Sequence, residues 1–246
     1  MKWKLIIASA VLLIAAIILF FRQYDGKPGP LPDDAMAAAE INEALSVRER
    51  RGAEAEQILD RIKLDKRHAF IPYISKGGYY AVSFWVWEKR KWRVGRIDTD
   101  SGPHIWKLSP NDPSRYYLVW NIRPQGEIED FSFYFIRQRN AGRSDGIDYY
   151  TPRIQLEQPV DFGKQPYGAI PYPDHWAKLL REEQRMSRTR GLFSFEYREN
   201  TSIYWLPVLA DNPPRSGGFS TFGTSFLESI RTDFVNILNE NELERP

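Results

Sequence analysis

The sequence contains no cysteine and only three histidines. Without cysteine the chain can form neither a disulfide bond nor a zinc site with thiolate ligands. The histidines, His68, His104 and His175, lie far apart and show no i,i+4 or HExxH spacing. We interpret each as an ordinary surface or turn residue, so the sequence predicts no metal site and no cofactor.

Motifs that carry well-known chemistry are also missing. The chain has no Gly-x-Ser-x-Gly elbow, no Walker A run and no dinucleotide fingerprint. Residues 98–102, DTDSG, begin like a calcium loop, but Pro103 follows and no Glu stands where a bidentate ligand is needed. A tight turn is the better interpretation, and we assign no catalytic residue.

A strong excess of one charge is absent as well, since the formal net charge is only +2. This net charge of +2 arises within residues 1–33, which contain four Lys or Arg residues and two Asp residues. The remaining chain is neutral. A protein that binds nucleic acid needs a basic face to neutralise phosphates. The sequence therefore predicts no nucleic-acid partner.

One long apolar run is present, over residues 5–21, and it contains no charge, Pro or Gly. A helix rises about 1.5 Å per residue against a hydrocarbon core of about 30 Å, so Trp3 and Arg22 are needed to complete a span. The bulky residues 19–23 contain no small-x-small cleavage site. The run predicts an uncleaved signal anchor that contacts the membrane, rather than a cleaved signal peptide.

Orientation follows from the charges around this run. Lys2 and Lys4 precede it, whereas Arg22 and Lys27, offset by Asp25, follow it. The positive-inside rule then places the N-terminus in the cytoplasm and the rest outside. The expectation is a single-pass protein of the cell membrane with an extracytoplasmic domain in a bacterial envelope.

The remaining chain predicts an α+β fold, an antiparallel β-meander sheet with helices packed on one face and at its ends. Asp33 is a candidate N-cap for the helical spacing that comes first, which breaks at Gly52. Alternation of period two follows, with a polar hairpin tip over residues 88–91, and a short helix that carries Trp176 is expected after Pro173. The expected boundaries are 1–22 for the transmembrane signal anchor, 23–33 for a Pro/Gly linker and 34–246 for the domain, with 34–66 helical, 69–138 a β-meander and 139–246 mixed.

The end of the chain predicts an amphipathic C-terminal helix over residues 225–239. Ser225 and Glu228 have the spacing of a capping box. The apolar stripe that follows consists of Phe226, Ile230, Phe234, Ile237 and Leu238. A stripe this wide is typical of a helix packed on a core.

Aromatic residues are plentiful, at 14% of the chain, and they occur on both faces of the first predicted hairpin. If Tyr80 and Phe84 face the core, then Tyr79, Trp85 and Trp87 face the other side. Exposed contiguous aromatics mark binding sites, so these three are the candidate binding residues for a glycan or a partner. The alternative is that a helix covers this face too, since sheets buried on both sides are apolar on both.

These patterns favour a non-enzymatic interaction or accessory protein of the cell envelope, with an envelope protein or a glycan as partner. Two alternatives stay open. One is an envelope hydrolase that uses an Asp/Glu pair, because spacing in sequence does not reveal pairs in space. The other is a carbohydrate-binding module that uses the aromatic strip.

Overall fold

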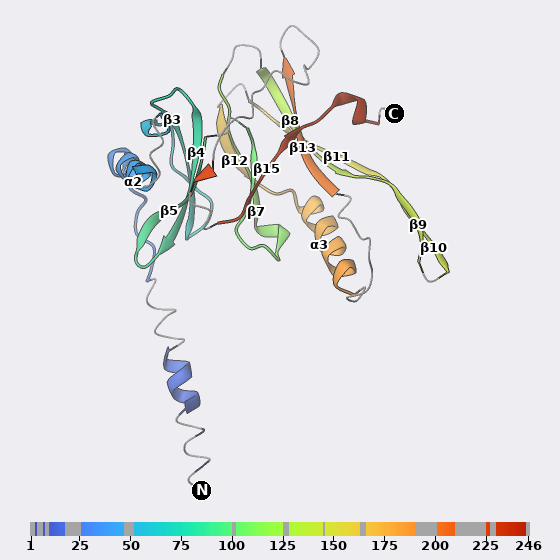
Figure 1. Ribbon diagram of the computed structural model, residues 1–246, viewed down its shortest axis with the longest axis horizontal. Helices are drawn as coiled ribbons and strands as arrows, with labels where there is room; N and C mark the ends of the chain where they lie inside the picture. Colours follow the sequence, from blue (N-terminus) through green and yellow to red (C-terminus); the bar gives the residue numbers. More distant parts are fainter. Residues whose placement is uncertain are drawn as a thin grey trace.

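The computed structural model describes residues 3, 7, 10–17, 26–46, 52–99, 102–124, 128–144, 146–162, 166–189, 201–209, 225–226 and 230–244. Most of the regular structure in them is antiparallel β-strand, in three larger sheets and one two-stranded ribbon. Figure 1 shows the three sheets side by side, with one helix on the outer face of the first and the ribbon projecting beyond the third. We call them the first, middle and third sheets in that order.

The first sheet has six strands, in the order β1-β3-β4-β5-β14 with β2 also paired to β3. Its strands are β1 (Ala55–Ile58), β2 (Ile62–Lys63), β3 (His68–Ser75), β4 (Tyr80–Glu88), β5 (Lys91–Asp98) and β14 (Ser225–Phe226). The helix α2 (Asp34–Ser46) lies against its outer face. Asp33 caps that helix as the sequence predicts, because its carboxylate accepts a 2.8 Å hydrogen bond from the Met36 N–H.

The middle and third sheets have four strands each. The middle sheet contains β12 (Tyr167–Pro171), β7 (Tyr116–Asn121), β6 (His104–Lys107) and β15 (Thr232–Phe234), in that order. The third contains β11 (Ile154–Val160), β8 (Ile128–Arg137), β13 (Thr201–Leu209) and β16 (Asn236–Ile237), and its β13–β16 pair is parallel. The remaining elements are η1 (Pro113–Arg115), β9 (Asn140–Ser144), β10 (Ile147–Thr151), α3 (Asp174–Thr189) and η2 (Glu240–Glu242).

The first sheet is buried on both faces, which explains its continuous apolar strands. Successive residues of β4 alternate between the two sides: Trp85 packs with α2, whereas Phe84 packs with Trp106 of the middle sheet. Asn121 joins these layers, because its side-chain amide donates to the Tyr73 and Ala81 carbonyls at 3.1 and 2.7 Å.

The largest core lies between the middle and third sheets. Trp120 of β7 contacts Phe131 and Phe133 of β8, with ring centroids 5.5 and 6.2 Å apart. Gly168 faces Trp120 from β12, and a Cβ there would lie 2.4 Å from the Trp120 ring, so glycine is needed at this position. The fully buried Trp176 of α3 closes one end of this core, as the short helix predicted after Pro173 implies.

The predicted transmembrane helix over residues 5–21 is not found. Of this range the structure describes residue 7 and residues 10–17, as helix, and the rest lies outside the described residues. A helix over 10–17 is about 12 Å long, and no helix among the described residues is long and apolar enough to cross a membrane. The single-pass signal anchor is therefore a wrong prediction, and so is the cell-membrane location, with an extracytoplasmic domain, that rested on it.

The α+β prediction is wrong too, chiefly at the C-terminus. Residues 225–239 do not form a helix over their described positions; they contribute β14, β15 and β16 to the edges of three different sheets. The apolar spacing of three to four residues comes from short strands joined by short connections. Backbone pairing with β5, β6 and β13 outweighs the helical pattern, and Val235, outside the predicted stripe, is fully buried.

Two further predictions of the same fold fail for a related reason. The helical stretch expected over 34–66 ends at Ser46, and after Gly52 the chain forms β1 and β2, which pair with β3. The single meander expected over 69–138 is divided among the three sheets, because β5–β6 and β7–β8 each pass from one sheet to the next. Within these sheets the β3–β4–β5 and β6–β7 pairs are antiparallel neighbours.

Candidate functional site

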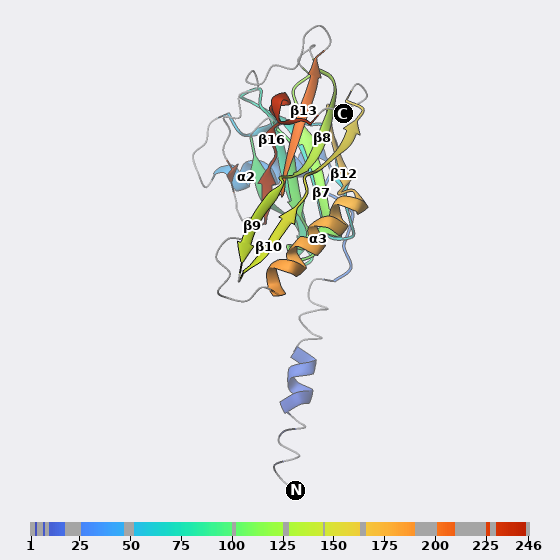
Figure 2. The ribbon, with the colours of Figure 1, turned by 90° about the vertical axis from the view of Figure 1, so that its right-hand side faces the viewer.

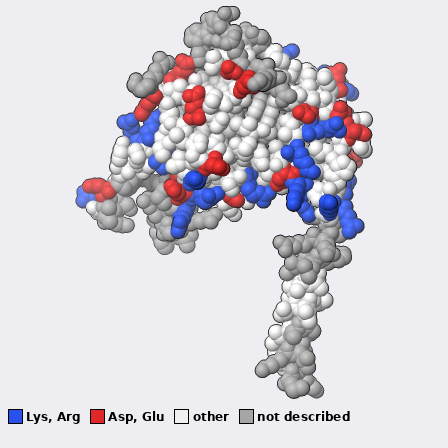
Figure 3. Space-filling view, turned by 180° about the vertical axis from the view of Figure 1, so that it is seen from behind, with Lys and Arg blue, Asp and Glu red and all other residues white. Residues whose placement is uncertain are grey.

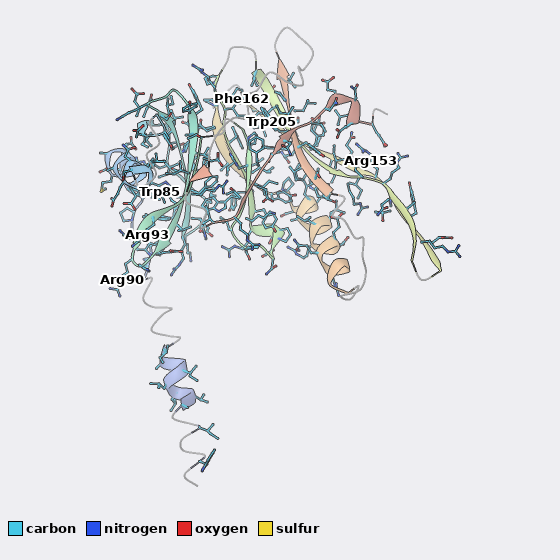
Figure 4. The ribbon with its side chains drawn as sticks, in the orientation of Figure 1. Trp85, Arg90, Arg93, Arg153, Phe162 and Trp205 are labelled. Carbon is cyan, nitrogen blue, oxygen red and sulfur yellow. The ribbon has the colours of Figure 1, made fainter. Side chains whose placement is uncertain are left out.

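The structure separates the three predicted binding residues. Trp85 is 1% exposed and Trp87 is 9% exposed, whereas Tyr79 is 49% exposed. Trp85 points toward α2, and its indole N–H donates a 2.8 Å hydrogen bond to the Ser83 hydroxyl (Figure 4). The helix thus covers this face of the hairpin, and the three aromatic rings do not form one open strip.

The predicted Pro/Gly linker contributes to this cover. Gly29 lies against the Trp87 ring, which stacks edge-on with Trp92 at a centroid distance of 5.7 Å. The Trp92 indole donates to the Gly29 carbonyl at 3.2 Å, and Arg67 donates to the Gly26 carbonyl at the same distance. The described part of the linker is therefore docked on the end of the first hairpin.

Charges on the back of the molecule are mostly mixed in sign (Figure 3). On that face a group of Lys and Arg side chains gathers at the end of the domain near the N-terminal segment. Lys89, Arg90 and Lys91, at the β4–β5 turn, are exposed. Lys89 and Arg90 have φ angles of 50° and 62°, in the left-handed region that glycine favours. The turn is tight, as its predicted position between Glu88 and Lys91 implies.

Buried carboxylates do not come together in the part of the chain that the structure describes. Asp98, in the first sheet, forms a 3.1 Å ion pair with Arg96. Glu183, on α3, accepts a 2.7 Å hydrogen bond from the Thr201 hydroxyl and lies 3.6 Å from Arg137. These two acids belong to different layers, and no group of three or more His, Asp or Glu among the described residues could hold a metal ion.

A row of polar residues lies between the first and middle sheets. An irregularity in β5 between Val94 and Arg96 brings Arg93, Arg96 and Asp98 onto one face, opposite Val86, Phe84 and Val82 of β4. Because Phe84 and Val82 pack against the middle sheet, this face of β5 points the same way. We call these three residues, together with His104 and Thr232, the polar row.

His104, on β6, faces the polar row from the middle sheet. It is 1% exposed and contacts the Phe84 and Phe234 rings, with centroids 6.0 and 5.5 Å away. Neither ring nitrogen has a hydrogen-bond partner among the described residues. Burial lowers the pKa of His104 to about 4; Asp98 opposes this shift and Arg96 adds to it.

His104 is the residue that the sequence-based interpretation missed, since a surface or turn position was expected. The signal was its place two residues before Trp106, because residues at i and i+2 of a strand share a face. Both side chains contact Phe84. A histidine that alternates with a buried tryptophan is itself expected to be buried.

The strands β9 and β10 form an arm, residues 140–151, that projects away from the three sheets (Figures 1 and 2). The arm continues the β8–β11 pair in the same register, since Arg137 faces Ile154 and Asn140 faces Thr151. The ladder breaks between them at Pro152, which has no N–H to donate. None of the arm's described side chains is buried, and Tyr150 is 66% exposed.

The C-terminal segment braces the root of the arm. The Gln155 side chain donates to the Glu244 carbonyl at 3.2 Å and accepts from the Glu244 N–H at 3.0 Å. Arg153 donates to the Glu242 carbonyl and to Gln138 across the ribbon (Figure 4). Arg139 pairs with the Glu244 carboxylate. These contacts fix the direction in which the arm leaves the third sheet, and we call them the root clasp.

Comparison of the chain with known protein families, with curated proteins and with solved structures finds no match.

Proposed function

We propose that this chain is a non-enzymatic interaction protein that holds an extended segment of a partner protein against the β9–β10 arm. The observation that supports the proposal is the arm itself, a two-stranded ribbon without a core of its own, held clear of the body by a braced root. An isolated two-stranded hairpin is only marginally stable in water. A third strand added by a partner stabilises it.

The open edges of the arm define where that strand adds. In the described chain, β9 and β10 pair only with each other. The turn is closed by the Ser144–Ile147 pair, which is the hydrogen-bonded pair of a two-residue hairpin loop. Hydrogen-bonded and open pairs then alternate, so the Ala141 and Tyr150 backbone groups point outward. Partner backbone pairs with them by strand addition.

The side chains of Arg143, Asp148 and Tyr150 lie on one face of the arm and add specificity. Arg143 and Asp148 lie opposite each other, 3.6 Å apart, and both are exposed. Next to them Tyr150 offers an exposed aromatic ring, and tyrosine is enriched in protein interfaces. Alternating apolar and charged contacts along a strand are the way in which strand addition selects its partner.

The two alternative functions have less support in the described residues. A hydrolase that uses an acid pair needs two carboxylates about 5–10 Å apart in one site, whereas Asp98 and Glu183 lie in different layers. A carbohydrate-binding module needs an open aromatic strip, whereas Trp85 and Trp87 are covered. No specific observation on the described residues favours hydrolysis or glycan binding over partner binding at the arm.

The test begins with a photo-crosslinking amino acid placed at position 141 or 150 in the full chain, and at the exposed Glu56 of β1 as a comparison site. A partner crosslinked at the arm is identified by mass spectrometry, and binding is then measured by calorimetry between the two purified proteins. Ala141→Pro or Tyr150→Pro, on the edge that the partner uses, should weaken binding about tenfold for each outward hydrogen bond removed.

The matched controls are Ala141→Val and Tyr150→Phe, which keep the backbone N–H and should bind within about threefold of the original chain, because strand addition uses backbone groups. Circular dichroism checks that each variant is folded. The proposal fails if positions 141 and 150 give no adduct beyond that at position 56. It also fails if both proline variants bind the purified partner as tightly as the original.

A further inference from the structure

The polar row lies apart from the arm, and it contains buried polar atoms without hydrogen-bond partners among the described residues. Among the described residues, the Arg93 Nε, both ring nitrogens of His104 and the Thr232 hydroxyl have no hydrogen-bond partner. Buried polar groups are paired in more than nine cases of ten, so their occurrence on facing strands needs an explanation. Leaving each of them unpaired is costly.

The strands that carry these atoms lie on the facing sides of the first and middle sheets. Thr232 lies opposite Trp106 and Phe234 lies opposite His104 in the β15–β6 pair, so all four share the face that packs on the first sheet. Arg93 lies on the matching face of β5, beside Val86. The described part of β14 pairs with β5 only at Ile97 and Asp98, so it does not reach Arg93.

The charge of the polar row is not balanced by its own residues. Asp98 is the acidic member and forms an ion pair with Arg96. Arg93 has no ion pair with any described acidic residue, although its Nε is buried. His104 is neutral near pH 7, because burial lowers the pKa of its ring. One positive charge thus remains half-buried between the sheets, an arrangement that a counter-ion stabilises.

We propose that the polar row binds a small oxyanion, a carboxylate or phosphate group, between β5, β6 and β15. The Arg93 guanidinium and the Thr232 hydroxyl donate hydrogen bonds to its oxygens. The neutral His104 ring adds one donor and one acceptor, which matches an oxyanion that itself carries a proton, such as hydrogen phosphate. Guanidinium groups bind planar and tetrahedral oxyanions with two parallel hydrogen bonds, which favours this class over chloride.

The experiment uses the full chain and titrates inorganic phosphate or acetate at constant ionic strength, with chloride as the balancing anion. Bound oxyanion should raise the thermal midpoint in a saturable way, by a few degrees. Arg93→Gln should abolish the rise, and His104→Phe should reduce it. Arg90→Gln is the matched control, because Arg90 lies on the same hairpin but is exposed (Figure 4).

Each variant is compared with its own midpoint in chloride, so that a change in stability does not imitate a change in binding. Calorimetry of the folded protein gives a second measurement, and Arg93→Lys retains the charge if the glutamine variant does not fold. The midpoint rising in phosphate but not in acetate assigns the phosphate class, and the reverse assigns carboxylates. The proposal is overturned if the midpoint does not saturate with added oxyanion, or if Arg93→Gln and Arg90→Gln lose the rise in midpoint equally. Either result means that water alone fills these hydrogen bonds.

Discussion

At the scale of single residues, the buried histidine is the most informative position. His104 stands where an aromatic hydrocarbon would fit, between the Phe84 and Phe234 rings. Asp98 and Arg96 of β5 are the charged groups that act on its ring. Arg93 lies on the same face of β5, and Thr232 lies on the same face of β15 as Phe234. Protonating the imidazole in this buried setting costs free energy, so the stability of the folded protein depends on pH.

We expect acid to destabilise the protein through His104. Its pKa is about 4 in the folded chain and about 6.5 when unfolded. Between these values the unfolded chain binds the extra proton, so stability falls as the pH drops from 6.5 to 4 and is unaffected by this group above 7. The full contribution is about 3 kcal/mol.

The measurement is urea denaturation at pH 7.5 and pH 4.5, in chloride buffers, for the original chain and for His104→Phe. The variant keeps the ring contacts and lacks the titrating group, so its loss of stability on acidification should be smaller by about 2 kcal/mol or more. Identical losses in the two proteins would show that His104 is protonated without cost, and therefore that it is hydrated.

At the scale of elements, the sequence predicts those parts whose local signal and tertiary contacts agree. The helix after Asp33 and the helix that carries Trp176 form as expected, and so do the hairpin β4–β5 and its turn. Residues 225–239 were predicted wrongly because their helical spacing conflicts with three strand pairings. Such pairings depend on sheet edges far away in the chain, which a local pattern does not contain.

The candidate site shows the same limit. The alternation along β4 correctly separates Phe84 from Trp85, but it does not tell which face a helix covers, and α2 covers the one with Trp85. The arm was missed although the sequence contains Asp145-Gly146, a dipeptide that is typical of hairpin turns, and Gly146 has a φ angle of 81°. Its projection depends on the break at Pro152 and on the root clasp, which joins residues far apart in sequence.

The root clasp makes a prediction about one element, the base of the arm. Gln155→Leu removes both hydrogen bonds to the Glu244 backbone, and these bonds are exposed. Global stability should fall by less than about 1 kcal/mol. Hydrogen exchange at Leu243 and Glu244 should become faster, because local opening there no longer breaks these bonds.

Gln158→Leu is the matched control, since Gln158 lies on the same strand and, among the described residues, its side chain bonds only to the neighbouring Pro159 carbonyl. It should leave exchange at the C-terminal segment unchanged. Equal exchange in the two variants and the original chain would mean that the clasp does not hold the segment. A loss of several kcal/mol in Gln155→Leu would mean that the clasp is part of the core.

At the scale of the whole molecule, the layers are connected through the middle sheet. Even-numbered residues of β7, such as Trp120, pack toward the third sheet, and odd-numbered residues, such as Val119, pack toward the first. Each sheet therefore lacks a complete core without its neighbour. This arrangement predicts that the three sheets unfold together, and that a change at the contact between two of them weakens all three.

Asn121 offers the test, because it is fully buried on β7 and bridges to two strands of the first sheet. Asn121→Leu keeps the volume but leaves the Tyr73 and Ala81 carbonyls without this donor, which should cost about 2–4 kcal/mol. Asn241→Leu, at an exposed position, should change stability by less than about 0.5 kcal/mol. If the layers form one cooperative unit, hydrogen exchange governed by global unfolding accelerates equally in β4 and in β13 of the Asn121 variant. Acceleration confined to β4 would show instead that the first sheet and α2 open while the other two sheets stay folded.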